Sequence, residues 1–190
     1  MQFKNLILTP LVAAGIASAA PNPEVKVFEL VALRSTSPIH HTRLQASNNG
    51  FALKLKDQGA SCDSADKINS ATFTLNTKTK EMLLYATSFP RQSAFTDRSG
   101  MGQGTMGYRT GAQPLCTRCE DNKWSISEDN FLKYDDIDNF IACPQTDGSY
   151  TVFTSAGVPN PGGNKDCVSV TFAVSEVTKP VGCLYSQQGQ

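Results

Sequence analysis

The 190-residue sequence predicts a single-domain, disulfide-bonded, all-β protein, built as an antiparallel β-sandwich or barrel. Short segments alternate apolar and polar residues between turn-forming residues, which is typical of antiparallel strands. No segment keeps a helical period over a useful length, so little helix is expected. Six cysteines follow an N-terminal segment with the pattern of an export signal, and cysteines of exported proteins are commonly paired in disulfides.

The first residues have the organisation of a secretory signal peptide. A positive charge at Lys4 precedes a short apolar run, and Ala17-Ser18-Ala19 supplies a small-residue cleavage site. We therefore expect residues 1–19 to be a signal peptide and residues 20–190 to be one secreted β domain. The apolar run has about 15 residues, fewer than the roughly 20 that span a bilayer, so no membrane partner is expected.

The charge balance gives no electrostatic case for a polyanionic partner. The chain carries 17 Lys and Arg residues against 17 Asp and Glu residues. Nucleic acids and anionic membranes attract proteins through a concentrated basic surface. We therefore expect no nucleic acid partner.

The first strands follow directly after the signal segment. Val25–Leu33 is rich in Val, Phe and Leu and predicts a strand that ends at a turn. Ile39–Ser47 predicts a second extended segment. Asn48-Asn49-Gly50 then leads into Phe51–Leu55, and this order predicts a β-hairpin because Asn and Gly tolerate positive φ.

Two further hairpins repeat this outline. Ala71–Leu75 and Met82–Ala86 flank a polar turn, and Trp124–Ile126 and Leu132–Tyr134 flank another. Three loosely similar hairpins allow a β-trefoil-like arrangement, which is the alternative to the sandwich or barrel. Their spacing is uneven, and the outline is one that any antiparallel hairpin shows.

The C-terminal third continues the β pattern. Phe140–Pro144 and Ser149–Phe153 flank an Asp-Gly turn and predict another hairpin. Gly157–Asn164 is rich in Gly, Pro and Asn and predicts a loop. Val168–Val177 alternates apolar and polar residues and predicts the last clear strand.

A glycine-rich stretch, Phe95–Gly111, separates the two patterned halves. Within it, Gly102–Gly107 matches the G-x-G-x-x-G motif of dinucleotide-binding folds. That motif needs a helix directly after it, and the following residues cannot form one of useful length. We therefore predict a turn, bulge or packed loop without a cofactor, in which Met101, Met106 and Tyr108 pack on the β core.

The cysteines predict a disulfide framework rather than a metal site. Six thiols allow 15 pairings, and Cys143 with Cys167 is favoured because the two bracket a predicted hairpin and loop. Cys116 and Cys119 have the C-x-x-C spacing of thiol oxidoreductases and of half a zinc site, but neither a helix start nor a second ligand pair accompanies them. A structural disulfide is therefore favoured there. The candidate disulfide residues are Cys62, Cys116, Cys119, Cys143, Cys167 and Cys183.

His40 and His41 are the two histidines of the chain. Acid–base chemistry by two histidines needs both imidazoles to converge on one substrate, whereas neighbours on a strand point to opposite faces. We therefore expect ordinary surface or half-buried histidines, and a role for one histidine with a distant carboxylate stays open.

A glycoside hydrolase would need two carboxyl groups across a cleft. Asp97, Glu120 and Asp136 are the first residues to replace in a test of that activity, and Arg98 beside Asp97 predicts an ion pair or loop anchor. Acidic turns are more often solvated surface, so no catalytic residue is assigned and the chain is not expected to be an enzyme.

A polysaccharide-binding module would instead need a platform of exposed aromatic rings. Trp124, Tyr108 and Tyr134 are the candidates for such a platform.

Several blocks of this sequence resemble the phiA-like cell wall proteins of filamentous fungi. They are FELVALRSTSPIHHTRLQASNNGFAL, ATFTLNTKTKEMLLYA, DRSGMGQGTMGY, the WSIS and FLKY pair, and FIACP followed by GSYTVF. The most specific parts are Ser-Gly-Met-Gly-Gln-Gly-x-x-Gly-Tyr and Ala-Cys-Pro. The pair Cys116 and Cys119 departs from the family pattern, which leaves the pairing of the six cysteines open.

The resemblance implies a secreted, extracellular protein of the fungal cell wall with a structural or developmental role in phialide and conidium formation. Cell-wall polysaccharide or other wall proteins would be its partners. The alternative functions are a secreted polysaccharide-binding or antifungal protein and, less favoured, a small secreted hydrolase.

Overall fold

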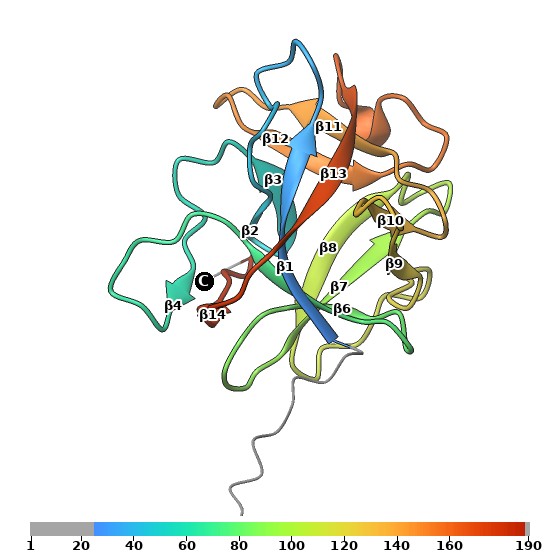
Figure 1. Ribbon diagram of the computed structural model, residues 1–190. Coiled ribbons are helices and arrows are strands. Elements are labelled where there is room, and N and C mark those ends of the chain that lie inside the picture. Colours follow the sequence, from blue (N-terminus) through green and yellow to red (C-terminus); the bar gives the residue numbers. More distant parts are fainter. Residues whose placement is uncertain (1–24, 189–190) are drawn as a thin grey trace, which may run out of the picture.

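The computed structural model describes residues 25–188, in which a ten-stranded antiparallel sheet closes into a barrel (Figure 1). The strand order is β11-β13-β1-β5-β6-β7-β8-β12-β3-β2, with additional pairing of β11 with β12 and of β8 with β3. Strand β11 begins this order, and β12, which pairs with β8 near its other end, also pairs with β11. This pairing closes the sheet. The predicted signal peptide, residues 1–19, lies outside the described residues.

Most strands lie within the predicted segments, whereas those at 61–62, 92–97, 105–110 and 183–184 were not predicted. The barrel strands are β1 (Val25–Leu33), β2 (Gln45–Ser47), β3 (Gly50–Leu53), β5 (Thr72–Asn76), β6 (Met82–Leu84), β7 (Gln92–Asp97), β8 (Thr105–Thr110), β11 (Phe140–Pro144), β12 (Tyr150–Thr154) and β13 (Val168–Glu176). Two small sheets pair β9 (Trp124–Ile126) with β10 (Leu132–Tyr134), and β4 (Ser61–Cys62) with β14 (Cys183–Leu184).

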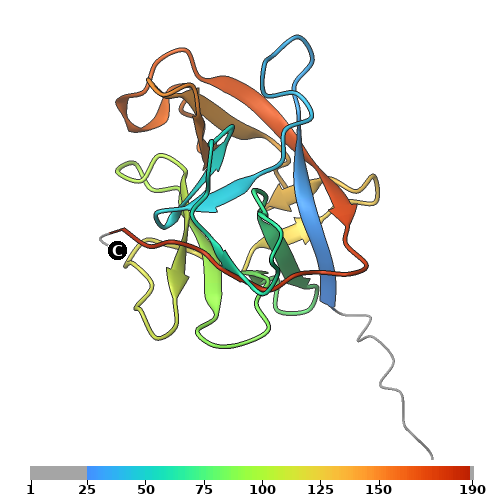
Figure 2. The same ribbon diagram turned by 90° about the vertical axis from the view of Figure 1, so that its left-hand side faces the viewer.

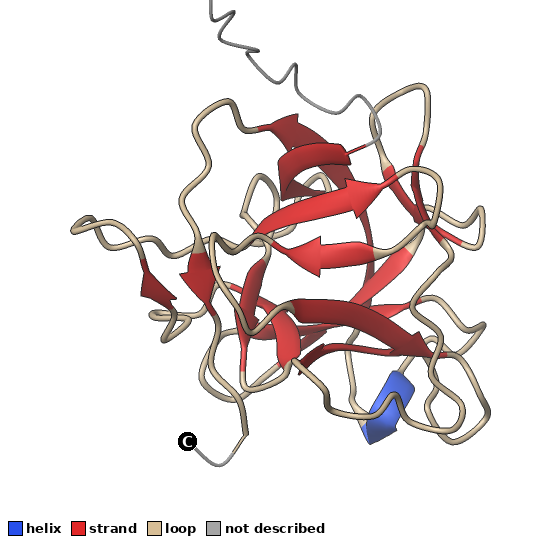
Figure 3. Ribbon diagram, turned by 90° about the horizontal axis from the view of Figure 1, so that it is seen from below, coloured by secondary structure: helices blue, strands red, loops and turns tan. Residues whose placement is uncertain are grey.

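The all-β, disulfide-bonded class is confirmed, and the closed form is a barrel. Among the described residues the helical content is one short turn, η1 (Pro161–Gly163), which lies in the predicted Gly/Pro/Asn-rich loop (Figure 3). No helix within residues 25–188 is long and apolar enough to cross a membrane. The trefoil-like alternative is not observed, because two of the three similar hairpins belong to the barrel and the β9–β10 hairpin is a separate sheet.

The core lies inside the ring of strands (Figure 2). In β1 the alternating residues Phe28, Leu30 and Ala32 are buried, as the apolar period of two predicts. The rings of Phe28 and Phe73 stack with their centroids 6.0 Å apart, and Phe51 contacts Phe73 at 5.7 Å. Burial of large apolar side chains such as these stabilises the folded barrel.

The prediction of an extended Ile39–Ser47 segment is only partly correct, since the strand covers Gln45–Ser47 alone. The chain first makes a turn in which His41 has a φ of 63° and its amide donates to the carbonyl of Ala32 at 2.8 Å. It then runs back along β1. This turn buries Ile39 in the core, which a continuous extended segment would not do at this point.

Candidate functional site

The glycine-rich stretch forms the β7–β8 hairpin, and each glycine of its G-x-G-x-x-G motif allows a close backbone approach. A Cβ atom on Gly104 would lie 1.9 Å from the carbonyl oxygen of Thr154 in β12. One on Gly102 would lie 2.5 Å from the Asp97 carbonyl oxygen, and one on Gly107 would lie 2.5 Å from a carbonyl oxygen of the β2–β3 turn. The prediction of a turn, bulge or packed loop is therefore confirmed, and close backbone packing accounts for the three glycines of the motif.

Gly104 also lies where the barrel closes. Its amide donates to the carbonyl of Asp97, and its carbonyl accepts the amide of Thr154, both at 2.8 Å. The Thr154 hydroxyl donates to the same carbonyl at 3.1 Å and contacts the hydroxyl of Thr96. The hairpin loop is thus hydrogen-bonded to the strand that completes the ring.

The three apolar side chains of this stretch do not all behave as predicted. Met106 and Tyr108 are buried in the core, and burial raises the pKa of Tyr108 to about 12. Met101, in contrast, is 91% exposed. The prediction for Met101 is wrong because this residue belongs to the loop between β7 and β8, outside the alternation that turns Met106 and Tyr108 inward.

A polar cluster lies beside the glycine-rich loop. Lys123 joins two carboxylates, with its Nζ atom 2.9 Å from Glu120 and 3.8 Å from Asp135. Asp135 also contacts the Arg98 guanidinium at 2.9 Å, and the Tyr134 hydroxyl donates to Glu120 at 3.2 Å. The hydrogen bond to Glu120 raises the pKa of Lys123, while burial followed by the Glu120 charge raises the pKa of Tyr134. An adjacent polar cavity of about 350 Å³ is lined by Arg98, Ser99, Arg118, Glu120, Asp135 and Ala156.

Glu120 and Asp136, two of the three residues proposed for a hydrolase test, line different cavities. Both oxygens of Glu120 are engaged, one by Lys123 and the other by Tyr134. Asp136 lines a different cavity, with Glu128 and Asp129. Lys123 instead links Glu120 to Asp135, the residue before Asp136. The ion pair predicted for Arg98 is made with Asp135 rather than with Asp97.

The three aromatic residues considered for a polysaccharide platform are all buried. Trp124 and Tyr134 face each other across the β9–β10 hairpin with their ring centroids 4.7 Å apart, and Tyr108 contacts Phe51 at 5.5 Å. They pack in the core because each lies on the face of its strand that points toward the core. They do not form a platform.

An exposed aromatic residue lies elsewhere, in the loop between β6 and β7, where sequence patterning did not reveal it. Phe89 is 81% exposed, and the guanidinium of Arg91 lies 5.3 Å from its ring centroid. Beside it is a cavity of about 220 Å³. The lining residues are Ser61, Asp63, Ala86, Ser88, Phe89, Pro90, Gly182, Cys183 and Leu184.

His40 and His41 lie on the turn after β1, and their rings stack with centroids 3.8 Å apart. The expectation that they point to opposite faces is wrong, because the chain turns here instead of continuing as a strand. Nδ1 of His40 accepts the Arg34 amide at 3.1 Å. His40 is half-buried and His41 is exposed, as predicted for ordinary surface histidines.

All six cysteines form disulfides, and these differ greatly in the length of chain they enclose. Cys62 pairs with Cys183 across 121 residues, Cys143 with Cys167 across 24, and Cys116 with Cys119 across 3. The Cys143–Cys167 pair is the one that the sequence favoured.

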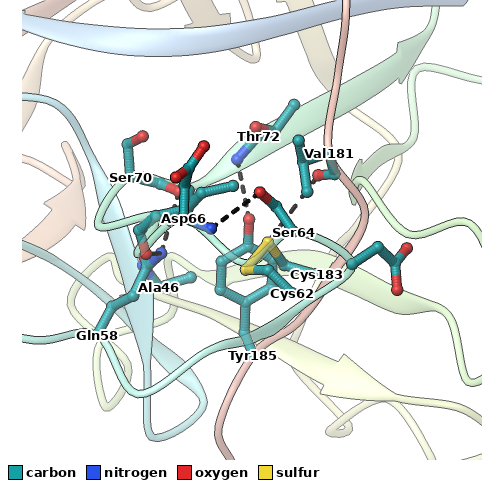
Figure 4. The surroundings of a disulfide bond; sticks show 12 residues. Ala46, Gln58, Cys62, Ser64, Asp66, Ser70, Thr72, Val181, Cys183 and Tyr185 are labelled. Atoms are coloured by element: carbon teal, nitrogen blue, oxygen red, sulfur yellow. Dashed lines mark hydrogen bonds between the residues drawn. A yellow bond between two sulfur atoms is a disulfide. The ribbon is translucent and has the colours of Figure 1, made fainter.

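The Cys62–Cys183 bond joins directly opposed residues of β4 and β14 (Figure 4). Next to it, the Tyr185 hydroxyl accepts the Thr72 amide at 3.0 Å, and burial raises the pKa of Tyr185 to about 12. Gln58 is fully buried and donates to the carbonyls of Ile68 and Ser70, which holds the polar loop before β5 against the barrel.

One group of potential metal ligands is found within residues 25–188. One oxygen of Asp97 and the sulfurs of Cys116 and Cys119 all lie within 4.8 Å of one another. The two sulfurs are bonded to each other in a disulfide, whereas a cysteine that binds a metal ion does so as a thiolate. In the disulfide form this group therefore does not offer two thiolate ligands to a metal ion.

The sequence matches proteins of one family over nearly all of the described residues. The family model described as PhiA-like secreted protein matches residues 28–186. The chain is 41% identical to cell wall protein phiA of Aspergillus fumigatus over 189 residues, which are 98% of this chain and all of that protein. It is 38% identical to cell wall protein phiA of Emericella nidulans over 178 residues, covering 93% of this chain and 95% of the relative. No solved structure matches this chain.

Proposed function

Because the chain belongs to the family of PhiA-like secreted proteins, we propose that this cell wall protein is a structural, non-catalytic component of the wall during phialide and conidium formation. Its localisation is extracellular. The relatives carry the name cell wall protein, which supports a role within the wall itself. The developmental part of the proposal follows from the family resemblance.

The engagement of the acidic side chains is the observation that carries the non-catalytic role. Glu120 accepts from Lys123 and Tyr134, and Asp135 is paired with Arg98. A carboxylate pair that works on a glycosidic bond must face the substrate with free oxygens. In this cluster, Lys123, Arg98 and the Tyr134 hydroxyl contact the carboxylate oxygens. The cluster therefore best fits a structural role, in which it holds the surface segments together.

The proposed role is tested by following the protein through development of a fungus that expresses it. Washed walls from vegetative hyphae and from conidiating cultures are compared by immunoblot. We expect the wall signal to rise when phialides and conidia form. An unchanged signal through conidiation would contradict the developmental role.

A second candidate function is direct contact with wall polysaccharide, and the exposure of Phe89 favours it. A pyranose ring has apolar C–H faces and a hydroxylated edge, so it binds where an aromatic ring lies beside polar groups. Phe89 and the 40% exposed Leu184 border a cavity that also contains Asp63, Ser61 and Ser88.

Replacing Phe89 by alanine tests this contact. Loss of one aromatic stacking surface is expected to weaken retention on insoluble β-glucan or chitin by about tenfold. The measurement is the bound fraction in a sedimentation assay. Met101→Ala is the matched control, because it removes another highly exposed apolar side chain from a different loop. Equal retention of both variants and the wild type would contradict a role for Phe89.

A further inference from the structure

We propose that the Cys116–Cys119 disulfide is a thiol-exchange site, through which the protein forms a mixed disulfide with a thiol-bearing protein of the wall. This inference rests on the proposed wall function and names a covalent mode of attachment for it. The partner is defined by its chemistry as a secreted protein with a free cysteine.

The two cysteines of this bond differ in exposure. Cys116 is exposed, whereas Cys119 is only 9% exposed. In the other two disulfides neither cysteine is exposed: Cys143 and Cys183 are buried, and Cys62 and Cys167 are half-buried. An attacking thiolate must reach one sulfur along the axis of the bond, so access selects Cys116 as the sulfur that is attacked.

Opening this bond leaves the barrel intact. The bond spans a turn of four residues in the connection between β8 and β9, and the Cys119 amide also donates to the Cys116 carbonyl at 3.0 Å. Directly after the turn, Glu120 and Thr96 exchange two backbone hydrogen bonds, each of 2.9 Å. These bonds hold the chain on β7 whether or not the disulfide is closed. The other two disulfides join β4 to β14 and β11 to the segment before β13.

The surroundings supply charged groups for exchange. A carboxylate oxygen of Asp97 lies within 4.8 Å of both sulfurs. Arg118 lies between the two cysteines in the chain, and its side chain is exposed on the polar cavity. A neighbouring guanidinium favours a thiolate over a thiol, which makes a cysteine a better leaving group.

The exchange step balances without an external oxidant. The partner thiolate attacks Sγ of Cys116, a new S–S bond forms, and the bond to Cys119 breaks with its electron pair on Sγ of Cys119. That thiolate takes a proton from water. In the reverse step the Cys119 thiol returns this proton to water, the Cys119 thiolate attacks Cys116, and the partner leaves as a thiolate. The number of disulfides is unchanged in each direction.

Glutathione is the probe for the test, applied to the fully oxidised, full-length mature protein. After brief exposure and acid quenching, the adducts are mapped by peptide mass spectrometry. We expect one glutathione on Cys116 and a free thiol on Cys119, with at least about tenfold less adduct on Cys119. The other two disulfides should remain closed. Adducts mainly on Cys119, earlier opening of another disulfide, or no adduct at all would overturn the proposal.

Two variants, each with one cysteine of this pair replaced, test the assignment of Cys116 in proteins whose folding is checked separately. Cys119→Ser leaves the exposed Cys116 thiol, which should form a lasting mixed disulfide with oxidised glutathione because no second thiol displaces it. Cys116→Ser leaves the less accessible thiol, which should react about tenfold more slowly. Circular dichroism checks that both variants keep the β fold. Equal rates in two folded variants would contradict the assignment of Cys116.

Extraction of the wall separates failure of this proposal from failure of the wall function. If exchange attaches the protein, a reductant together with detergent should release it, and the double variant Cys116→Ser/Cys119→Ser should leave with detergent alone. A wall-bound wild type that detergent alone releases would overturn the exchange proposal and leave the wall function standing. Absence of the protein from the wall would contradict the wall function itself.

Discussion

Replacing Gly104 by alanine should lower the free energy of unfolding by about 4 kcal/mol, the combined cost of a strained backbone and an overpacked contact. The φ of Gly104 is 92°, a value that residues with a Cβ atom rarely adopt. In addition, the new methyl group would lie 1.9 Å from the Thr154 carbonyl oxygen. Strand β8 or β12 has to move, and this junction closes the barrel.

Two matched glycines separate these effects. Gly148 has a φ of 85° with no atom within 4 Å of a new Cβ, so Gly148→Ala measures the backbone strain alone. Gly100 has open space and no positive φ, and Gly100→Ala should change stability by less than about 0.5 kcal/mol. Guanidinium unfolding followed by the fluorescence of buried Trp124 provides the measurement. A loss for Gly104→Ala no larger than that for Gly148→Ala would contradict the close approach of the strands.

Removing the Cys62–Cys183 disulfide should cost about 5 kcal/mol, the largest loss of the three bonds. The bond restricts the unfolded chain over 121 residues, and closure entropy grows with the logarithm of that length. The same relation gives about 3.5 kcal/mol for Cys143–Cys167, across 24 residues, and about 2 kcal/mol for Cys116–Cys119, across 3.

The comparison uses three double serine variants, each lacking one disulfide, in the same unfolding assay. We expect the midpoints to fall in the order of the enclosed chain length, with the largest shift for Cys62→Ser/Cys183→Ser. A loss on removing Cys116–Cys119 that equals the loss for Cys62–Cys183 would contradict this order. It would also contradict the view that the short bond is free to open.

The local strands were predictable because their signals are local. Val25–Leu33 is a strand with the predicted bounds, since alternate apolar residues face one core. The turn at Asn48 and Asn49 was predictable as well, because both residues adopt positive φ, at 51° and 62°. Turn chemistry and the period of two depend only on neighbouring residues, which a sequence displays directly.

Closure of the barrel and the Cys62–Cys183 pairing were not predictable, because both join distant segments. Strand β1 pairs with β13 near the other end of the chain, and no periodicity records that partner. Strands β4 and β14 contain two residues each, too few to show alternation, and the Cys62–Cys183 bond lies between them. The sequence left 15 pairings open for this reason.

The candidate site was predicted less well than the fold, because exposure depends on tertiary packing. Trp124 and Tyr134 are directly opposed in the β9–β10 register and turn inward, whereas Phe89 lies in a loop with no period and turns outward. The sequence showed that no helix follows the glycine motif, and the structure has strand β8 there, because the local pattern records this feature. Which backbone each glycine contacts became visible only in the structure.

Wall fractionation of conidiating cultures is the most direct test of whether this protein is a secreted component of the wall. Culture fluid, detergent extract, reductant extract and the residual wall are probed with an antibody to this protein, and a cytosolic marker controls for lysis. A secreted wall protein of this family should appear in the wall fractions and in the culture fluid, with its strongest wall signal during conidiation. Absence from both the wall and the culture fluid of a conidiating culture would contradict the claim.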